Sequence, residues 1–237
     1  MRTKTLLLTA AVLAAGLGAS VAQLVYSVNS VGYVNVTLRT GYNLVANPLN
    51  GANNNVNTTI TGGANLADCT IARWDTGVQN FLPSDTYFFV GPADPANGWY
   101  DGSLNPSTTV INPGEGFFIL NPNPVTTITF VGDVPQGTLT VPIAANFGFY
   151  AGKVPQTIDI LSVGFPGQAD MTYSTWDSVG QGYTAAATYF FIAPSDPGNG
   201  FYDQGLNLYT AAPAPGQGFL ISNPGIAASW TRTFSVN

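Results

Sequence analysis

The chain contains an internal repeat with a period of 102 residues. Residues 74–122 align with residues 176–224 without a gap, and 24 of the 49 aligned positions are identical. A repeat of this kind is the signature of a fold built from similar units, each about 100 residues long. A unit of this length can enclose its own core, so the repeat predicts two similar domains in tandem.

Each copy consists of short runs rich in Val, Ile, Thr, Tyr and Phe, bounded by clusters of Gly, Pro, Asn and Asp. Such runs are typical of strands and turns, and no segment after residue 22 shows a helical stripe. Two runs alternate as half-buried strands do, with Val34, Val36 and Leu38 in the first and Leu139, Val141 and Ile143 in the second. Pro142 moves the second run toward a sheet edge.

The sequence therefore predicts an all-β fold of two tandem β-sandwich or barrel-like domains. The first domain is expected over residues 23–135 and the second over residues 136–237. The boundary is expected near Gly132 to Gly137.

The first 22 residues have the features of a signal peptide. Arg2 and Lys4 precede an apolar run from Leu6 to Leu17, and Ser20-Val21-Ala22 is a small-x-small cleavage site. The run is shorter than the roughly 20 residues that cross a bilayer. We expect cleavage, secretion to the extracellular space or cell surface, and no transmembrane span afterwards; an uncleaved anchor is the alternative.

Charge excludes several classes of partner. Cleavage leaves four basic residues against 12 acidic ones, a formal net charge of −8. Nucleic-acid binding needs clustered Lys and Arg, so nucleic acid is not an expected partner. Charged residues make up only 8% of the chain, against about 25% in an average domain, so solubility depends on Asn, Ser and Thr.

The composition also argues against catalysis. The chain has no His, which rules out a Ser/His/Asp triad and His-ligated zinc. The only Glu, Glu115, aligns with Gln217 in the second copy. A carboxylate pair could come only from Asp residues such as Asp75 and Asp101. We expect a protein that is not an enzyme.

Four of the 12 acidic residues lie in one repeated loop. The loop contains Asp94, Asn97 and Asp101 in the first copy and Asp196, Asn199 and Asp203 in the second. Carboxylate and amide oxygens are ligands that Ca²⁺ prefers, which makes these six residues candidates for a calcium site in each copy. The alternative is a structured turn, since Asp-Pro and Asn-Gly pairs are typical of turns.

The same loop carries aromatic residues that could stack on sugar rings. These are Trp99 and Tyr100 in the first copy and Phe201 and Tyr202 in the second. Trp99 and Phe201, which lie beside the Asn-Gly pair, are expected to be exposed and to form a glycan-binding platform. Trp74 and Trp176 are instead interpreted as core anchors.

The segment that follows the signal peptide has two interpretations. One apolar face continues from Tyr26 to Leu38, which is longer than a usual strand. It predicts either two strands joined by a kink at Ser30 to Gly32, or an arm of residues 23–31. Such an arm would add to the sheet edge of a neighbouring molecule.

Two motifs resemble a loosely defined class of secreted bacterial β-modules. The opening is Gly41-Tyr42-Asn43-Leu44-Val45-Ala46-Asn47-Pro48, and the closing is Pro113-Gly114-Glu115-Gly116-Phe117-Phe118-Ile119. The resemblance covers nearly all of the chain after residue 22. The second copy departs from the pattern at its opening, where no Asn-Pro follows. It implies export and a β fold, and it implies no activity.

The sequence as a whole predicts a non-enzymatic structural or adhesive protein of the cell surface or extracellular matrix. It would act by self-association or by contact with other surface components. The alternative is a module that binds polysaccharide through the aromatic loops, with two copies providing avidity.

Overall fold

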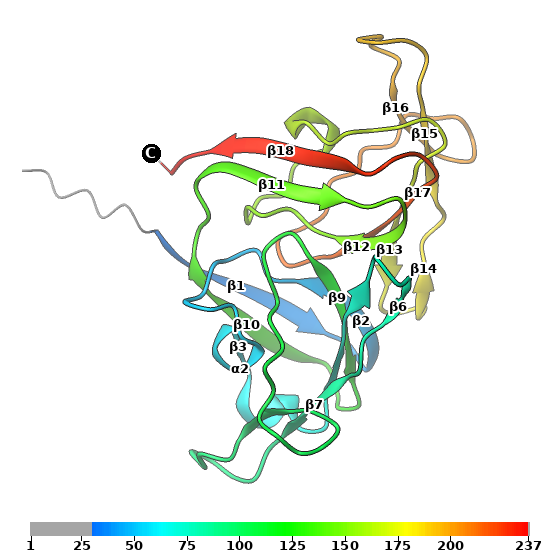
Figure 1. Cartoon of the computed structure of the whole chain (residues 1–237). Coiled ribbons are helices and arrows are strands. Elements are labelled where there is room, and N and C mark those ends of the chain that lie inside the picture. Colours follow the sequence, from blue (N-terminus) through cyan, green and yellow to red (C-terminus); the bar gives the residue numbers. More distant parts are fainter. Residues whose placement is uncertain (1–29, 237) are drawn as a thin grey trace, which may run out of the picture.

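The computed structural model describes residues 30–236 and shows an all-β protein (Figure 1). The predicted all-β class is confirmed. Three short helical turns interrupt the strands, namely α2 (Val56–Thr59), η1 (Gly63–Leu66) and η2 (Leu161–Val163). The predicted signal peptide and residues 23–29 of the proposed arm lie outside the described residues.

The N-terminal half, residues 31–133, is built from one larger and one smaller sheet. The larger sheet has the order β2-β9-β4-β7-β8 and the smaller one β1-β10-β3, while β5 and β6 form a separate hairpin. The strands are β1 (Val31–Leu38), β2 (Gly41–Ala46), β3 (Ile60–Thr61), β4 (Thr70–Ala72), β5 (Trp74–Asp75), β6 (Asn80–Phe81), β7 (Asp85–Phe88), β8 (Gly98–Tyr100), β9 (Gly116–Asn121) and β10 (Thr126–Asp133).

The C-terminal half, residues 137–234, has a matching arrangement. Its larger sheet has the order β12-β17-β13-β15-β16, with β14 paired to β13, and β11 pairs with β18. The strands are β11 (Gly137–Ile143), β12 (Asn146–Tyr150), β13 (Thr172–Asp177), β14 (Gly182–Tyr183), β15 (Ala187–Phe190), β16 (Gly200–Tyr202), β17 (Phe219–Asn223) and β18 (Ala228–Phe234). Strands about 102 residues apart thus hold equivalent places in the two halves. The division into two domains stays a prediction, and its expected boundary falls between β10 and β11.

Each half encloses its own buried apolar cluster between its larger and smaller sheets. In the N-terminal half Phe117 of β9 meets Phe130 of β10, with ring centroids 6.3 Å apart. In the C-terminal half Phe219 of β17 meets Trp230 of β18 at 6.4 Å. Aromatic side chains bury large apolar areas, so these pairs contribute much of the stability of each half.

The two alternating runs form β1 and β11 as the sequence predicts. In β1 the side chains of Val34 and Val36 pack against the buried cluster, whereas Tyr33 on the other face is 71% exposed. β11, which contains Pro142, has β18 as its sheet neighbour and lies at an edge. A proline fits there because the outer side of an edge strand needs no backbone donor.

A hairpin of the N-terminal half holds the edge of the C-terminal sheet. The indole Nε1 of Trp74 donates to the carbonyl of Phe147, the second residue of β12, at 3.1 Å. The side-chain amide of Gln79 makes two bonds to the same residue: its Nε2 donates to the Phe147 carbonyl at 2.9 Å, and its Oε1 accepts from the Phe147 N–H at 3.0 Å.

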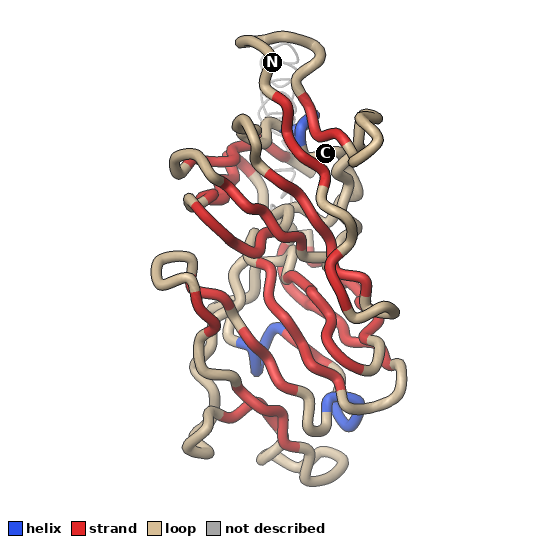
Figure 2. The backbone as a smooth tube through the Cα atoms, turned by 90° about the vertical axis from the view of Figure 1, so that its right-hand side faces the viewer, coloured by secondary structure: helices blue, strands red, loops and turns tan. Residues whose placement is uncertain are grey.

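The C-terminal half holds the edge of the N-terminal sheet in the same way. Trp176 Nε1 donates to the carbonyl of Tyr42 in β2 at 2.7 Å. Gln181 Oε1 accepts from the Tyr42 N–H at 2.7 Å, and its Nε2 donates to the Tyr42 carbonyl at 3.1 Å. We call this pair of hairpin contacts the reciprocal clasp. Figure 2 shows the backbone from the side on which β6 and β14 lie in Figure 1. Each half therefore pairs the edge that the other half's sheet would leave open.

A third apolar cluster fills the space between the halves. Leu44, Phe118 and Phe149 are buried in it, and Trp74 and Trp176 are partly buried against them. The Trp176 ring meets Phe118 edge-on at 5.1 Å, and the Trp74 ring meets Phe149 at 5.8 Å. The two tryptophans, interpreted from the sequence as core anchors, thus pack against the buried cluster of the junction and are only partly buried there.

The Pro-Gly-x-Gly turns complete the junction by backbone pairing. The Ala151 N–H donates to the carbonyl of Gly114 at 3.1 Å, and the Ala46 N–H donates to that of Gly216 at 2.9 Å. Both glycines have positive φ values, +97° and +80°, which glycine adopts without strain. A Cβ on Gly116 would come within 3.1 Å of the Tyr150 backbone. These turns therefore require glycine because two segments of the backbone approach each other closely.

Shortening a clasp glutamine should destabilise the protein. Gln79 and Gln181 have positive φ values, +54° and +53°, a conformation that Asn also adopts. Gln79→Asn and Gln181→Asn therefore keep the turn but cannot reach the opposite backbone. Each should lower the free energy of unfolding by about 1–2 kcal/mol, measured by urea denaturation. Gln204→Asn, in an exposed turn after β16, is the matched control, and equal stability of all three variants would contradict the role of the clasp.

Candidate functional site

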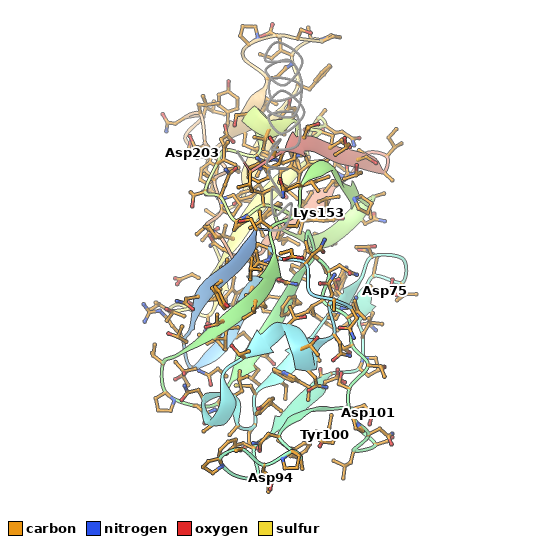
Figure 3. The ribbon with its side chains drawn as sticks, turned by 90° about the vertical axis from the view of Figure 1, so that its left-hand side faces the viewer. Asp75, Asp94, Tyr100, Asp101, Lys153 and Asp203 are labelled. Carbon is orange, nitrogen blue, oxygen red and sulfur yellow. The ribbon has the colours of Figure 1, made fainter. Side chains whose placement is uncertain are left out.

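The predicted Asp/Asn loops lie in opposite halves of the molecule, with Asp94 and Asp101 near the bottom of Figure 3 and Asp203 in its upper part. In the first loop Asp94 Oδ1 accepts from the Ala96 N–H at 2.8 Å. Asn97 Oδ1 accepts from the Val90 N–H at 2.7 Å, and its Nδ2 donates to the Gly91 carbonyl at 2.7 Å. Asp101 Oδ1 accepts from the backbone N–H groups of Ser103 at 2.8 Å and Asn105 at 2.9 Å.

The second loop repeats these bonds. Asp196 Oδ1 accepts from the Gly198 N–H, and Asn199 bridges the backbone of Ile192 and Ala193. Asp203 Oδ1 accepts from the backbone N–H of Asn207 at 2.9 Å. The equivalent bonds from Asn105 and Asn207 lower the pKa of Asp101 and Asp203 below the ordinary value of 3.8, because they stabilise the charged carboxylate.

These contacts support the interpretation of the loops as structured turns. An oxygen of each of the six predicted calcium ligands already accepts a hydrogen bond within its own loop. Among residues 30–236 no group of three or more His, Cys, Asp and Glu side chains is gathered in a way that could hold a metal ion. The loops thus contain residue types that can bind Ca²⁺, but the described residues do not gather their carboxylates into a cluster that could hold the ion.

The aromatic residues of the loops do not form an exposed platform. Trp99 and Phe201 are fully buried, so the expectation that they are exposed is wrong. They are the central residues of β8 and β16, and the alternation of a strand turns their side chains into the core. There Trp99 packs against Tyr87 and Phe201 against Tyr189, each at 5.4 Å.

The neighbouring tyrosines help to hold their own loops. The Tyr100 hydroxyl donates to the Ala96 carbonyl, and the Tyr202 hydroxyl donates to the Gly198 carbonyl, both at 2.8 Å. Both rings are half-buried, and Tyr202 packs edge-on against Phe190. The four predicted glycan-binding residues are therefore used mainly to build the two ends of the molecule.

The end of the C-terminal half carries a cluster of exposed apolar side chains, which we call the C-terminal tip. It comprises the last residue of β15 and the turns after β15 and β16, at the top of Figure 1. Its members and their exposed fractions are Phe190 (40%), Phe191 (49%), Ile192 (62%), Leu206 (70%) and Leu208 (69%). A shallow hollow of about 250 Å³ lies on it, between Phe190, Ile192 and Leu206. Clustered exposed apolar side chains of this kind commonly mark interaction sites.

The equivalent end of the N-terminal half is less apolar. Val90 and Leu104 are 64% and 68% exposed there, but Phe89, which aligns with Phe191, packs against the buried cluster. The sequence did not single out the C-terminal tip. The run Phe190-Phe191-Ile192 has an equivalent in the first copy, Phe88-Phe89-Val90, so the run alone does not distinguish the two ends.

Comparison with protein-family models, curated proteins and solved structures finds no match for the chain. In the described part of the chain, no helix is long and apolar enough to cross a membrane.

Calcium should leave the thermal stability of the protein unchanged. The loop oxygens already accept hydrogen bonds from the turns, so added Ca²⁺ would have to displace these bonds. Thermal melts in millimolar CaCl₂ and in chelator should give the same Tm. A Tm several degrees higher in Ca²⁺, lost in an Asp101→Ala/Asp203→Ala double variant, would establish calcium binding instead.

Proposed function

We propose that this chain is a non-enzymatic, secreted structural or adhesive protein of the cell surface or extracellular matrix. It acts by self-association, with the C-terminal tip of one copy packing against the tip of a second copy. The observation that carries the proposal is the cluster of five exposed apolar side chains at one end of the molecule.

Charge favours the tip as the place where two copies meet. The chain after residue 22 has a formal net charge of −8, so copies repel one another over most of their surface. The five side chains of the tip are uncharged. The carboxylates nearest to them in sequence, Asp196 and Asp203, each accept backbone hydrogen bonds from their own turns. Contact through the tip thus buries uncharged apolar side chains.

Geometry favours a contact between identical tips. The hollow beside Phe190 and Ile192 is open and shallow, and Leu206 and Leu208 project from the same end of the molecule. Two copies related by a twofold axis could each place a leucine against the other's aromatic surface, as isologous contacts do. The burial would contribute roughly 25 cal/mol for each Å² of apolar surface removed from water.

Glycan binding through the aromatic loops is less well supported, because two of the four residues predicted to bind the glycan are buried.

The proposal that the protein is secreted rests on the signal-peptide features of residues 1–22.

Removing apolar side chains from the tip should abolish self-association. The mature chain from Gln23 should form dimers or larger species in size-exclusion chromatography with light scattering. Phe191→Ser/Ile192→Ser should be monomeric with an unchanged Tm, because both side chains are exposed. Val125→Ser/Ile226→Ser replaces two apolar residues that are more exposed (58% and 79%, against 49% and 62%) and lie in other turns, and this variant should associate like wild type. A monomeric wild-type chain would refute the proposal.

A further inference from the structure

A groove of about 480 Å³ lies where the two halves meet. Its lining includes four ionic side chains, namely Arg73, Asp75, Glu115 and Lys153, together with the aromatic rings of Trp74 and Tyr150. Asp75 and Lys153 are labelled at the level of this junction in Figure 3. The groove holds two of the four basic residues that follow residue 22.

One of these basic residues is paired and the other is not. Arg73 Nε lies 2.6 Å from Glu115 Oε1, and each side chain is more than three-quarters buried. Lys153 has no carboxylate of the described residues within 4.0 Å. Its stem lies over Gly114, where a Cβ would come within 3.1 Å of the Lys153 Cε. Partial burial lowers the pKa of Lys153 below its ordinary value, since water is removed from the ammonium group.

A second groove on the other side of the junction provides an internal comparison. It has a volume of about 250 Å³ and is lined by Trp176, Ser178 and Gln217, with no ionic side chain in its lining. The turn at Gly216 meets Val36 there as the turn at Gly114 meets Val141.

Three of the four ionic side chains, those of Arg73, Glu115 and Lys153, occupy positions that hold neutral residues in the second groove. Arg73 and Glu115 align with Thr175 and Gln217 at the 102-residue offset. Lys153 corresponds to Pro48, because the Ala151 and Ala46 backbone bonds are equivalent. The junction thus forms on the second side without any of these charges, so they are not needed to hold the halves together.

The groove also presents an aromatic ring in a fixed orientation. The Trp74 indole is held by its bond to the Phe147 carbonyl and by edge-on contacts with Phe81 at 4.9 Å and Phe149 at 5.8 Å. The ring is only partly buried and lines the groove. A partly exposed, immobilised indole beside an unpaired cation suits a ligand that has both an apolar face and a negative charge.

From this geometry we infer that the groove binds a sugar acid, a saccharide whose ring carries a carboxylate. The carboxylate pairs with the Lys153 ammonium group. The apolar face of the sugar ring packs against Trp74, and its hydroxyl groups donate to the carboxylates of Asp75 and Glu115. This site is independent of the C-terminal tip and of self-association, and it uses none of the aromatic loop residues predicted to bind glycans.

Calorimetric titration of the mature chain with trigalacturonic acid tests the inference. Trigalacturonic acid should bind at least tenfold more tightly than cellotriose, a neutral trisaccharide, and than acetate, which has no ring. Binding should weaken as salt is added, because the contact is between charges. Absence of binding, equal binding of cellotriose or equal binding of acetate would each overturn the assignment.

Variants show whether the charge of Lys153 is responsible. Lys153→Gln should reduce affinity at least tenfold, whereas Lys153→Arg, which keeps the charge and a long stem, should retain it. Arg39→Gln removes an equal charge outside the groove and should bind like wild type. Wild-type affinity in Lys153→Gln would overturn the proposal, and unchanged light scattering in these variants would separate it from self-association.

Discussion

The open edge of a β-sheet is the physical constraint on which this structure depends. β2 and β12 are the terminal strands of the two larger sheets, and an unpaired terminal strand offers backbone groups to any other chain. Here the hairpin of each half pairs the exposed backbone of the other, through Gln79 on Phe147 and Gln181 on Tyr42. The reciprocal clasp therefore couples the two halves and protects both edges at once.

The clasp also determines which parts of the surface remain exposed and available for binding. It places the halves end to end, so that β7 of one half and β15 and β16 of the other lie at the two ends farthest from the junction (Figure 1). The C-terminal tip is then free to present apolar side chains. The junction has two grooves in matching positions, of which only one is lined by Arg73, Glu115 and Lys153. The second groove thus provides a neutral comparison for the charged one.

Short runs of strand-forming residues bounded by turn residues were enough to predict the all-β class, and the alternation of apolar and polar residues predicted the inward faces of β1 and β11. Both properties follow from local sequence. The turn bonds of Asp94, Asn97 and Asp101 agree with the turn interpretation of Asp-Pro and Asn-Gly. Trp99 and Phe201 were misplaced because strand β8 begins at Gly98, and β16 at Gly200, inside what the sequence suggests is a loop. Asn and Gly are depleted in strands, so an Asn-Gly pair indicates a turn more readily than the start of a strand.

Contacts between the halves could not be predicted, since they join residues far apart in the sequence. Gln79 and Gln181 are identical at the repeat spacing, which was the available signal, but their partners are backbone groups of Phe147 and Tyr42 and leave no side-chain pattern. The position of Lys153 in the groove likewise could not be predicted, because it depends on how the second half places this side chain over Gly114.

Hydrogen exchange at two backbone amides tests the clasp most directly. The N–H groups of Tyr42 and Phe147 lie on the outer edges of their sheets, where glutamine side chains of the opposite half accept from them. Both amides should exchange as slowly as those inside the sheets, and exchange should accelerate at Tyr42 in Gln181→Asn and at Phe147 in Gln79→Asn. Exchange of both amides at the rate of solvent-exposed edge positions in the wild-type protein would contradict the account.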